Sequence, residues 1–321
     1  MEKILHKVIE NINTNFEESI LLDNKKIKID KLRFKQISSN NSNKKISFID
    51  GGNLEIIKSP SICLFFNRVY STTYCNNKRK KNNIVEFFSL ITTFNQDNKI
   101  MYKVNYEFTK NKLELNEYIF DSMDKDLMFQ NKRIEIHTVG DIIRRLAEIE
   151  IINQTDTDFV VLDGSLEQVY PYEKQSFEKI NKHIKICALS KTNSTLGSMG
   201  RSIIPILSNQ SNFTEWQYEF THNQQYRSFF VKLNKNSDYI FRFDCNLNVN
   251  IDEVLSLLKL NSKDPIFLGY PYGLIEADKF ARVTNKEQES LKIKLMTIKE
   301  FEKLKKYIIT KDAHSILDNI S

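Results

Sequence analysis

The sequence is poor in the residues that commonly hold transition metals or form disulfides. Of 321 residues, only four are cysteine and five are histidine, and none of them forms a CxxC, HxH or HExxH motif. Because carboxylates are the remaining candidates, a metal ion bound by this chain would depend mostly on aspartate and glutamate. Each cysteine lies in an apolar or strand-like run, so four buried free thiols are expected, at Cys63, Cys75, Cys187 and Cys245.

Long apolar runs are also lacking. The sequence has no stretch of about 18 apolar residues, which a membrane-spanning helix requires, and it begins without the basic, apolar and small-residue pattern of a signal peptide. We therefore expect a soluble, cytoplasmic protein. Apolar residues make up 40% and charged residues 27% of the chain, a balance that is typical of a globular protein and excludes wholesale disorder.

The excess of positive charge is small. The formal net charge of +6, from 47 basic and 41 acidic residues, permits a nucleic-acid partner but does not require one. Lys, Asn and Ile are used in excess over Arg, Gly and Ala, as in the products of AT-rich genomes, so part of the basicity is compositional. The densest basic run, residues 78–81 (KRKK), is expected at a hairpin tip, where it contacts a DNA backbone or is merely solvated.

Apolar periodicity divides the first half of the chain into a helix followed by strands. The first thirty residues favour a helix, with an apolar stripe that Phe16 and Ile20 extend, so residues 1–37 are expected to be an N-terminal helical segment. A polar linker leads to the main domain, residues 46–321. That domain begins with an apolar run broken by Asp50-Gly51-Gly52, which predicts a strand, a tight turn and a second strand. Further strands are expected at 61–74, 83–94 and 104–108.

The second half alternates helices with strands. A helix that begins at Thr138 precedes the FVVL run at 159–162, whose continuous apolar character is typical of a strand buried on both faces. This order predicts an α/β fold, with a mixed sheet flanked by helices and additional helices at both ends of the chain. The later expected elements are helix 173–182, strand 184–190, hairpin 226–233 with 238–245, helix 251–260, a strand that turns into a helix at about Pro271, and helices 286–307 and 311–319.

Three acids stand out by their positions. Asp50 and Asp163 each follow a predicted strand and precede glycine, and open sheets bind ligands at the carboxyl ends of their strands. Glu148 lies on the helix before the Asp163 strand. This order is the layout of ribonuclease-H-like nucleases, whose clustered carboxylates hold two divalent ions about 4 Å apart for phosphodiester hydrolysis. Magnesium and manganese prefer such oxygen ligands.

Each acid also has a plainer interpretation. An aspartate before glycine is commonly a turn residue, and a glutamate on an amphipathic helix commonly faces solvent. Glu148 lies near the edge of the apolar stripe of its helix, so Glu150 is an alternative ligand.

Seven segments together resemble the NurA nuclease family. They occur in the family's order over nearly the whole chain after the first helix, and the sixth is the most specific of them. The segments are FIDGGN (48–53), RRLAEIE (144–150), VVLDGSLE (160–167), ALSKT (188–192), FRFD (241–244), GYPYGLIEADKFARV (269–283) and AHSILD (313–318).

The resemblance implies a ribonuclease-H-like core that cuts DNA with manganese or magnesium, two ions being expected. It also implies a homodimer partnered with HerA, a hexameric ATPase, in DNA end resection for double-strand break repair. The family's metal-site residues carry over to Asp50, Glu148 and Asp163. A further tyrosine and a histidine or aspartate of the family correspond to Tyr270 and Asp278.

Two departures from the family pattern bear on the C-terminal segment. Asp278 stands where some relatives have histidine, which leaves open whether it is a ligand, a proton shuttle or neither. Gly273 stands where a second proline is common, and it is expected only to loosen the turn.

Several other residues are candidates for substrate contact. Lys191 follows a strand end beside the Asp163 strand and is expected to contact a phosphate; a surface lysine is the alternative. The remaining candidates are Arg242 and Arg282 for phosphate contact, and Tyr270 and Tyr272 for stacking on the bases of a single strand, with core packing as the alternative.

The predicted function is that of a metal-dependent DNA nuclease, a single-strand endonuclease or 5′–3′ exonuclease, for which Asp50, Glu148, Asp163, Tyr270 and Asp278 are the catalytic candidates. The alternatives are a non-catalytic DNA-gripping partner of the ATPase and a ribonuclease-H-like nuclease that acts on RNA or junctions. His314, in the closing segment, is expected to be structural.

Overall fold

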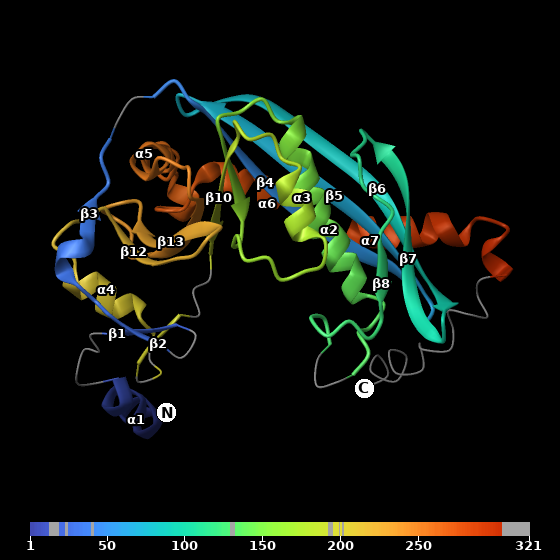
Figure 1. Cartoon of the computed structure of the whole chain (residues 1–321), viewed down its shortest axis with the longest axis horizontal. Helices are drawn as coiled ribbons and strands as arrows, with labels where there is room; N and C mark the ends of the chain where they lie inside the picture. The colour runs from blue at the N-terminus through green and yellow to red at the C-terminus, as the bar shows by residue number, and fades with distance from the viewer. Residues whose placement is uncertain are drawn as a thin grey trace.

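An eleven-stranded sheet runs through the centre of the molecule (Figure 1). The computed structural model describes residues 1–12, 19–22, 25–39, 42–128, 132–191, 195–198, 200 and 202–303. Within them the strand order is β3-β12-β13-β14-β10-β9-β4-β5-β6-β7-β8. The strands are β3 Phe34–Gln36, β4 Lys45–Lys58, β5 Ile62–Cys75, β6 Lys78–Gln96, β7 Lys99–Lys110, β8 Ile119–Asp121, β9 Phe159–Asp163, β10 Lys185–Ser190, β12 Trp216–His222, β13 Tyr226–Lys232 and β14 Phe241–Asn246.

The sheet is mixed because β9 runs parallel to both of its neighbours, β4 and β10. The other strand pairs of this sheet are antiparallel. As the FVVL run predicts, Val160, Val161 and Leu162 of β9 are fully buried, since helices cover both faces of the sheet at this strand.

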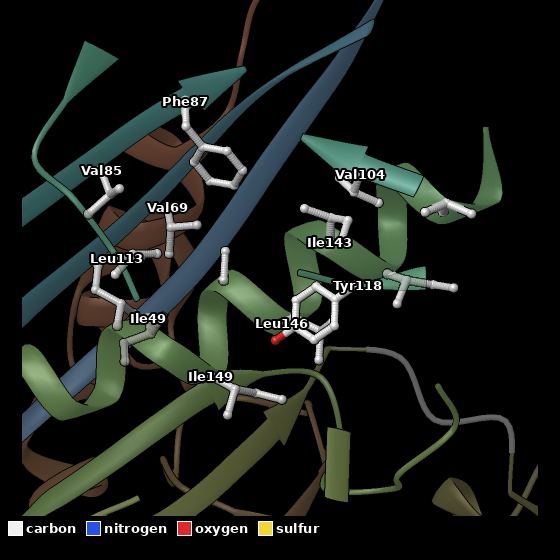
Figure 2. Close-up of a cluster of buried hydrophobic side chains, with 14 of the residues drawn as sticks. Ile49, Val69, Val85, Phe87, Val104, Leu113, Tyr118, Ile143, Leu146 and Ile149 are labelled. Atoms are coloured by element: carbon white, nitrogen blue, oxygen red, sulfur yellow. The ribbon is translucent and has the colours of Figure 1, made fainter. Parts of the chain in front are cut away.

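Helices lie on both faces of the sheet. Figure 1 shows α2 (Thr138–Glu150) and α3 (Glu173–Glu178) in front of it and α5 (Ile251–Asn261) and α6 (Tyr272–Ala281) behind it. Because side chains alternate along a strand, β4 supplies both cores: Ile49 packs in the α2 core and Phe48 in the α6 core. Figure 2 shows the α2 core, where Ile143, Leu146 and Ile149 lie near Ile49 and Val69 of the strands.

The strand–turn–strand prediction around Asp50-Gly51-Gly52 is wrong. β4 continues through this segment as one strand of 14 residues, and its ladder with β5 includes Asp50↔Tyr70, Gly51↔Val69 and Gly52↔Arg68. The glycines therefore do not make a turn. They let other elements approach the strand closely, as described below.

The helix expected over the first thirty residues is also wrong after Ile12. Helix α1 covers Glu2–Ile12, and strands β1 (Ser19–Leu22) and β2 (Lys25–Lys28) follow it; Phe16 lies outside the described residues. With β11 (Leu196–Gly197) these strands form a three-stranded sheet. Ile20 is buried against helix α4 (Ile204–Gln210) rather than continuing a helical stripe. Packing with distant residues thus outweighs the local periodicity here.

The C-terminal part is helical, as expected, for as far as it is described. Helix α7 (Asn285–Met296) begins at a capping box formed by Thr284 and Glu287. Leu291 and Leu295 of α7 pack on an apolar cluster of β4, β5 and β6. The expected helix at 311–319, the AHSILD segment and His314 lie outside the described residues.

Other expectations have mixed outcomes. The strand expected before Pro271 is a 3-10 helix, η3 (Pro265–Phe267), but α6 begins directly after Pro271 as expected. The four cysteines are free, although Cys75 is only half-buried. Within the described part of the chain, no helix is long and apolar enough to cross a membrane. Two further 3-10 helices are η1 (Lys31–Arg33) and η2 (Ile151–Gln154).

Candidate metal centre

Asp50 and Asp163 are neighbours on two parallel strands. The ladder between β4 and β9 runs as far as Ile49↔Leu162, so the next residue on each strand is one of the two aspartates. Since the preceding pair lies in the α2 core, alternation directs both aspartates to the opposite face, which α6 covers. β9 ends at Asp163, and Gly164 follows with a φ of 106°. Glycine adopts that conformation without the strain other residues incur.

Asp278 on α6 completes a group of three carboxylates. One carboxylate oxygen from each of Asp50, Asp163 and Asp278 lies within 4.8 Å of the other two. All three side chains are half-buried, so the group is shielded yet reachable from solvent. Hard divalent cations bind clustered carboxylate oxygens of this kind.

Two glycines allow α6 to lie directly on β4. A Cβ at Gly52 would lie 2.4 Å from the carbonyl oxygen of Ala281, and a Cβ at Gly273 would lie 2.0 Å from Cδ2 of Phe48. Contacts this short are excluded, so both positions must lack a side chain. Gly273 thus does more than loosen a turn, contrary to the expectation: it lies within α6 and makes its close approach possible. That approach brings Asp278 to the two sheet aspartates.

A cation of the chain itself lies among these acids. Nζ of Lys191 is 2.7 Å from Oδ2 of Asp163 and 3.1 Å from Oδ1 of Asp278. Nη2 of Arg282 donates to Oδ2 of Asp278 at 2.8 Å, and Oη of Tyr270 donates to Oδ1 of Asp163 at 3.3 Å. Charged and polar donors of the chain therefore hold the carboxylates of Asp163 and Asp278.

Glu148 approaches the centre from the other face of the sheet. A Cβ at Gly51 would lie 2.6 Å from Oε1 of Glu148, so this glycine makes room for the carboxylate of α2. Arg144 donates to Oε1, and Nη1 of Arg145 donates to Oε2 at 3.2 Å. Glu148 is 3% exposed and is an electrostatic neighbour of Asp50. It does not belong to the three-carboxylate group found among the described residues.

Glu150, the alternative to Glu148, lies elsewhere. Its electrostatic neighbours are Lys179 and Glu114, and it in turn affects Tyr118. Burial raises the pKa of Glu150. Of the two glutamates, therefore, Glu148 is the one that faces the aspartates.

The electrostatics of Asp50 favour a bound cation. Burial, followed by the neighbouring charges of Glu148 and Asp163, raises the pKa of Asp50 to about 8. A carboxyl group that holds its proton at neutral pH does so because no sufficient positive charge lies beside it. A divalent ion supplies that charge, and the oxygen-only donor set fits magnesium or manganese. The residues present therefore fit the metal that the sequence predicts.

The predicted substrate contacts fall into two groups. Lys191 and Arg282 border the carboxylates, and the side chain of Arg282 is 68% exposed. Arg242 is instead paired with Asp244 at 3.0 Å and Glu167 at 2.7 Å, and it braces the loop after β9.

The two tyrosines that are predicted to stack on bases are not exposed as such a contact would require. Tyr270 is 0% exposed, so its ring packs in the core instead of meeting a base. Tyr272, the first residue of α6, is half-buried against the same core. The basic run 78–81 starts β6, where Arg79 pairs with Glu276 at 3.0 Å.

Arg145 is a residue of the centre that the sequence analysis does not identify. Nε of Arg145 donates to Glu173 at 2.9 Å, and its Nη2 donates to the carbonyl oxygen of Ser165 at 2.9 Å, which ties α2 to the loop after Asp163. A signal for this was present: Arg144 and Arg145 precede Glu148 by four and three residues, the spacing at which helix side chains meet. These residues border a cavity of about 220 Å³ beside Asp163. A larger cavity of about 610 Å³ is lined by none of the three aspartates.

Part of the chain is similar to a known protein family. Residues 142–283 match the family model of the NurA domain, a range that includes Glu148, Asp163 and Asp278 but not Asp50. No curated protein matches the sequence.

Among solved structures, the NurA nuclease from Sulfolobus solfataricus is similar over 97% of this chain and 99% of its own, with a TM-score of 0.55 and 15% identity. Endonuclease V from Ciona intestinalis, solved with an inosine-containing DNA, is similar over 79% of this chain and 89% of its own, with a TM-score of 0.43 and 10% identity. The resemblance to the NurA family and the predicted ribonuclease-H-like α/β fold are thereby confirmed.

Proposed function

We propose that this chain, whose residues 142–283 match the NurA domain, is a metal-dependent nuclease that hydrolyses DNA. The observation that carries the proposal is the convergence of Asp50, Asp163 and Asp278, whose carboxylate oxygens lie within 4.8 Å of one another. These residues come from two neighbouring strands and a later helix. Lys191 and Arg282 neutralise part of this charge, but burial and the charges of Glu148 and Asp163 still raise the pKa of Asp50 to about 8, so a further cation beside Asp50 would stabilise the group.

The residues of the site have different roles in the proposed phosphodiester hydrolysis. Manganese or magnesium, one or two ions, supplies Lewis-acid stabilisation of the reacting oxygens and a more acidic water. Asp50, Asp163 and Asp278 would hold the metal, and Glu148, an electrostatic neighbour of Asp50, would hold a second ion or a water. Tyr270, through its hydrogen bond to Asp163, orients that carboxylate.

Two cations border the carboxylates and are suited to bind the phosphate. Lys191 presents a compact ammonium at the end of β10, and Arg282 presents an exposed guanidinium one helical turn after Asp278. Both are paired with Asp278. With a metal bound at that carboxylate, the two cations would be free to contact the phosphate of the DNA.

The finer assignment follows from the family resemblance. We propose a cytoplasmic, homodimeric enzyme that cuts single-stranded DNA internally or from the 5′ end, and that works with a HerA-type ATPase in end resection and double-strand break repair. The match of residues 142–283 to the NurA domain supports this assignment. An assay of the dimer alone and with the cognate ATPase tests it, with added processivity as the expected result.

The nuclease proposal itself is tested with labelled single-stranded DNA, duplex DNA and an RNA–DNA hybrid in parallel. The wild-type chain is expected to cut DNA with manganese and not with a chelator. Asp50→Ala and Asp163→Ala are each expected to abolish cutting while the chain remains folded. Full activity in either variant would refute the proposal, and cutting of only the hybrid would point to an RNA-directed enzyme. Tight DNA binding without cutting or metal uptake would instead identify a DNA-gripping partner.

A further inference from the structure

Helix α6 carries a second acid, Glu276, which is more deeply buried than Asp278. Glu276 is 4% exposed, yet its carboxylate has three donors from the sheet. Oη of Tyr70 donates to Oε1 at 2.6 Å, Nη1 of Arg79 donates to Oε1 at 3.0 Å, and Tyr74 donates to Oε2. A buried carboxylate is tolerated only with such a full set of partners, and these partners fix its position closely.

The donors tie α6 to the strand register that carries Asp50. Tyr70 is the direct cross-strand partner of Asp50 in the β4–β5 ladder, and cross-strand partners project from the same face of a sheet. Asp163, Asp50 and Tyr70 therefore stand in one row across β9, β4 and β5. Helix α6 lies over this row, so that Asp278 meets one end of it and Glu276 meets the other.

The contacts at the two glycines do not fix the rotation of α6 about its own axis, whereas the contacts of Glu276 do. Gly52 and Gly273 set how closely α6 lies on β4, but close contact does not stop a helix from turning about its own axis. Asp278 follows Glu276 by two residues, which places the two side chains on nearly opposite flanks of the helix. A rotation that lifted Asp278 from Asp163 would drive Glu276 against the sheet, and the opposite rotation would pull Glu276 away from Tyr70, so either one disturbs the contacts of Glu276.

We propose that Glu276 is a positioning residue of the metal centre, which locks the rotation of α6 through Tyr70, Tyr74 and Arg79 and thereby presents Asp278 to the metal. This inference rests on the proposed metal-dependent function. A purely structural role would have a different signature, because a buried ion pair adds little net stability compared with well-packed apolar residues.

The test is a double-mutant cycle read by manganese affinity in the full chain without DNA. Glu276→Gln keeps the size of the side chain but removes the charge, and Asp278→Asn removes the ligand to which Glu276 is coupled. In the otherwise unchanged chain, Glu276→Gln is expected to weaken manganese binding by about tenfold, as loss of a residue that orients a ligand typically does. In the Asp278→Asn chain the same change is expected to have almost no effect. Titrations extended to millimolar manganese keep both backgrounds measurable.

Thermal unfolding of the same four proteins separates positioning from stability. Glu276→Gln is expected to lower Tm by the same amount in both backgrounds, since the hydrogen bonds to the tyrosines are weakened equally in each. The matched control is Glu215→Gln, which removes another shielded carboxylate from its ion pair with Lys259 at 2.8 Å, and which is expected to leave manganese affinity unchanged.

Equal losses of manganese affinity in both backgrounds, or a lowered Tm with unchanged affinity, would overturn the inference. These outcomes differ from failure of the nuclease proposal. A wild-type chain that binds manganese but leaves DNA intact refutes the nuclease function, while the cycle still decides the role of Glu276. A wild-type chain that binds no manganese refutes both.

Discussion

Nζ of Lys191 lies 2.7 Å from Oδ2 of Asp163, so an ammonium group of the chain itself neutralises a carboxylate of the candidate metal centre. The same ammonium lies 3.1 Å from Oδ1 of Asp278. It therefore competes with an incoming metal ion for two of the three clustered carboxylates. Opposite charges this close interact by several kcal/mol at an effective dielectric of about 20, an attraction that the ion must replace.

Replacing Lys191 with methionine is expected to strengthen manganese binding several-fold and to slow DNA cleavage. Binding strengthens because no ammonium must leave the carboxylates, and cleavage slows because the phosphate loses a contact. Calorimetric titration and a cleavage assay measure the two effects. Lys279→Met, at an exposed position of α6, is the control and should change neither. Weaker manganese binding in the Lys191 variant would show that the lysine organises the site instead of competing for it.

Alanine at Gly51 and at Gly52 should separate catalysis from stability. A Cβ at Gly52 meets backbone, the carbonyl oxygen of Ala281 at 2.4 Å, whereas a Cβ at Gly51 meets the end of a side chain, Oε1 of Glu148 at 2.6 Å. Gly52→Ala is therefore expected to cost about 1–3 kcal/mol of unfolding free energy. Gly51→Ala is expected to cost less than Gly52→Ala, because Glu148 can rotate away, but to reduce cleavage strongly.

Urea unfolding and cleavage assays of both glycine variants provide the measurement. Gly164→Ala is a useful comparison, because no atom lies within 4 Å of the added Cβ and only the backbone conformation, with φ of 106°, opposes it. If Gly51→Ala were as unstable as Gly52→Ala, the α2 side of β4 would be as rigid as the α6 side.

The sequence was sufficient to place the two sheet aspartates but not to explain their glycines. The apolar FVVL run correctly marks β9, and Asp163 directly follows it. The DGG segment has the composition of a turn, yet it is strand throughout, because the reason for its glycines lies in α2 and α6, which approach from either face. These contacts join distant parts of the chain, and a local sequence pattern does not reveal them.

Asp278, the third member of the carboxylate group, also shows that local sequence pattern does not reveal contacts between distant residues. The resemblance makes Asp278 a candidate whose role is open and places Glu148 among the predicted ligands. In the folded chain Asp278 joins Asp50 and Asp163, and Glu148 is held by Arg144 and Arg145. Helix periodicity places a residue on a face, but the few ångströms that decide ligation depend on how each helix packs on the sheet.

Manganese uptake should release a proton from Asp50. Its pKa is raised to about 8 by burial and then by Glu148 and Asp163, so near pH 7 the metal-free carboxyl holds a proton that metal binding must displace. Calorimetry near pH 7, in buffers that differ in ionisation enthalpy, is expected to show close to one proton released per chain. The release should diminish above about pH 9, where the carboxyl is already ionised. An unchanged proton count at high pH would assign the proton to another group.

The carboxyl group of Asp50 also makes the stability of the chain without metal depend on pH. The folded state keeps the Asp50 proton up to about pH 8, whereas the ordinary pKa of the side chain is 3.8. Between these values the folded state binds more protons than the unfolded state, so stability is expected to fall as pH rises through this window. Asp50→Asn should remove this part of the dependence. The difference in unfolding free energy between the two chains, measured across the window, checks the sign.

Tyr270→Phe should affect the metal and leave single-stranded DNA binding unchanged. The ring is 0% exposed, so it offers no surface to a base, but its hydroxyl donates to Oδ1 of Asp163 at 3.3 Å. Loss of that bond is expected to cost about 1 kcal/mol of stability and to weaken manganese binding and cleavage several-fold. Fluorescence anisotropy with a labelled single strand, in the presence of a chelator, measures DNA affinity apart from the metal.

Tyr218→Phe is the matched control, because that side chain is also 0% exposed and its hydroxyl accepts a hydrogen bond from the backbone N–H of Asp30 at 3.3 Å. It is expected to lose similar stability with no change in manganese affinity, since it lies in the cluster of β12 and α4. Should Tyr270→Phe instead weaken DNA binding while manganese affinity stays the same, the ring must become accessible to the substrate. The role of Tyr270 would then be contact with DNA and not orientation of Asp163.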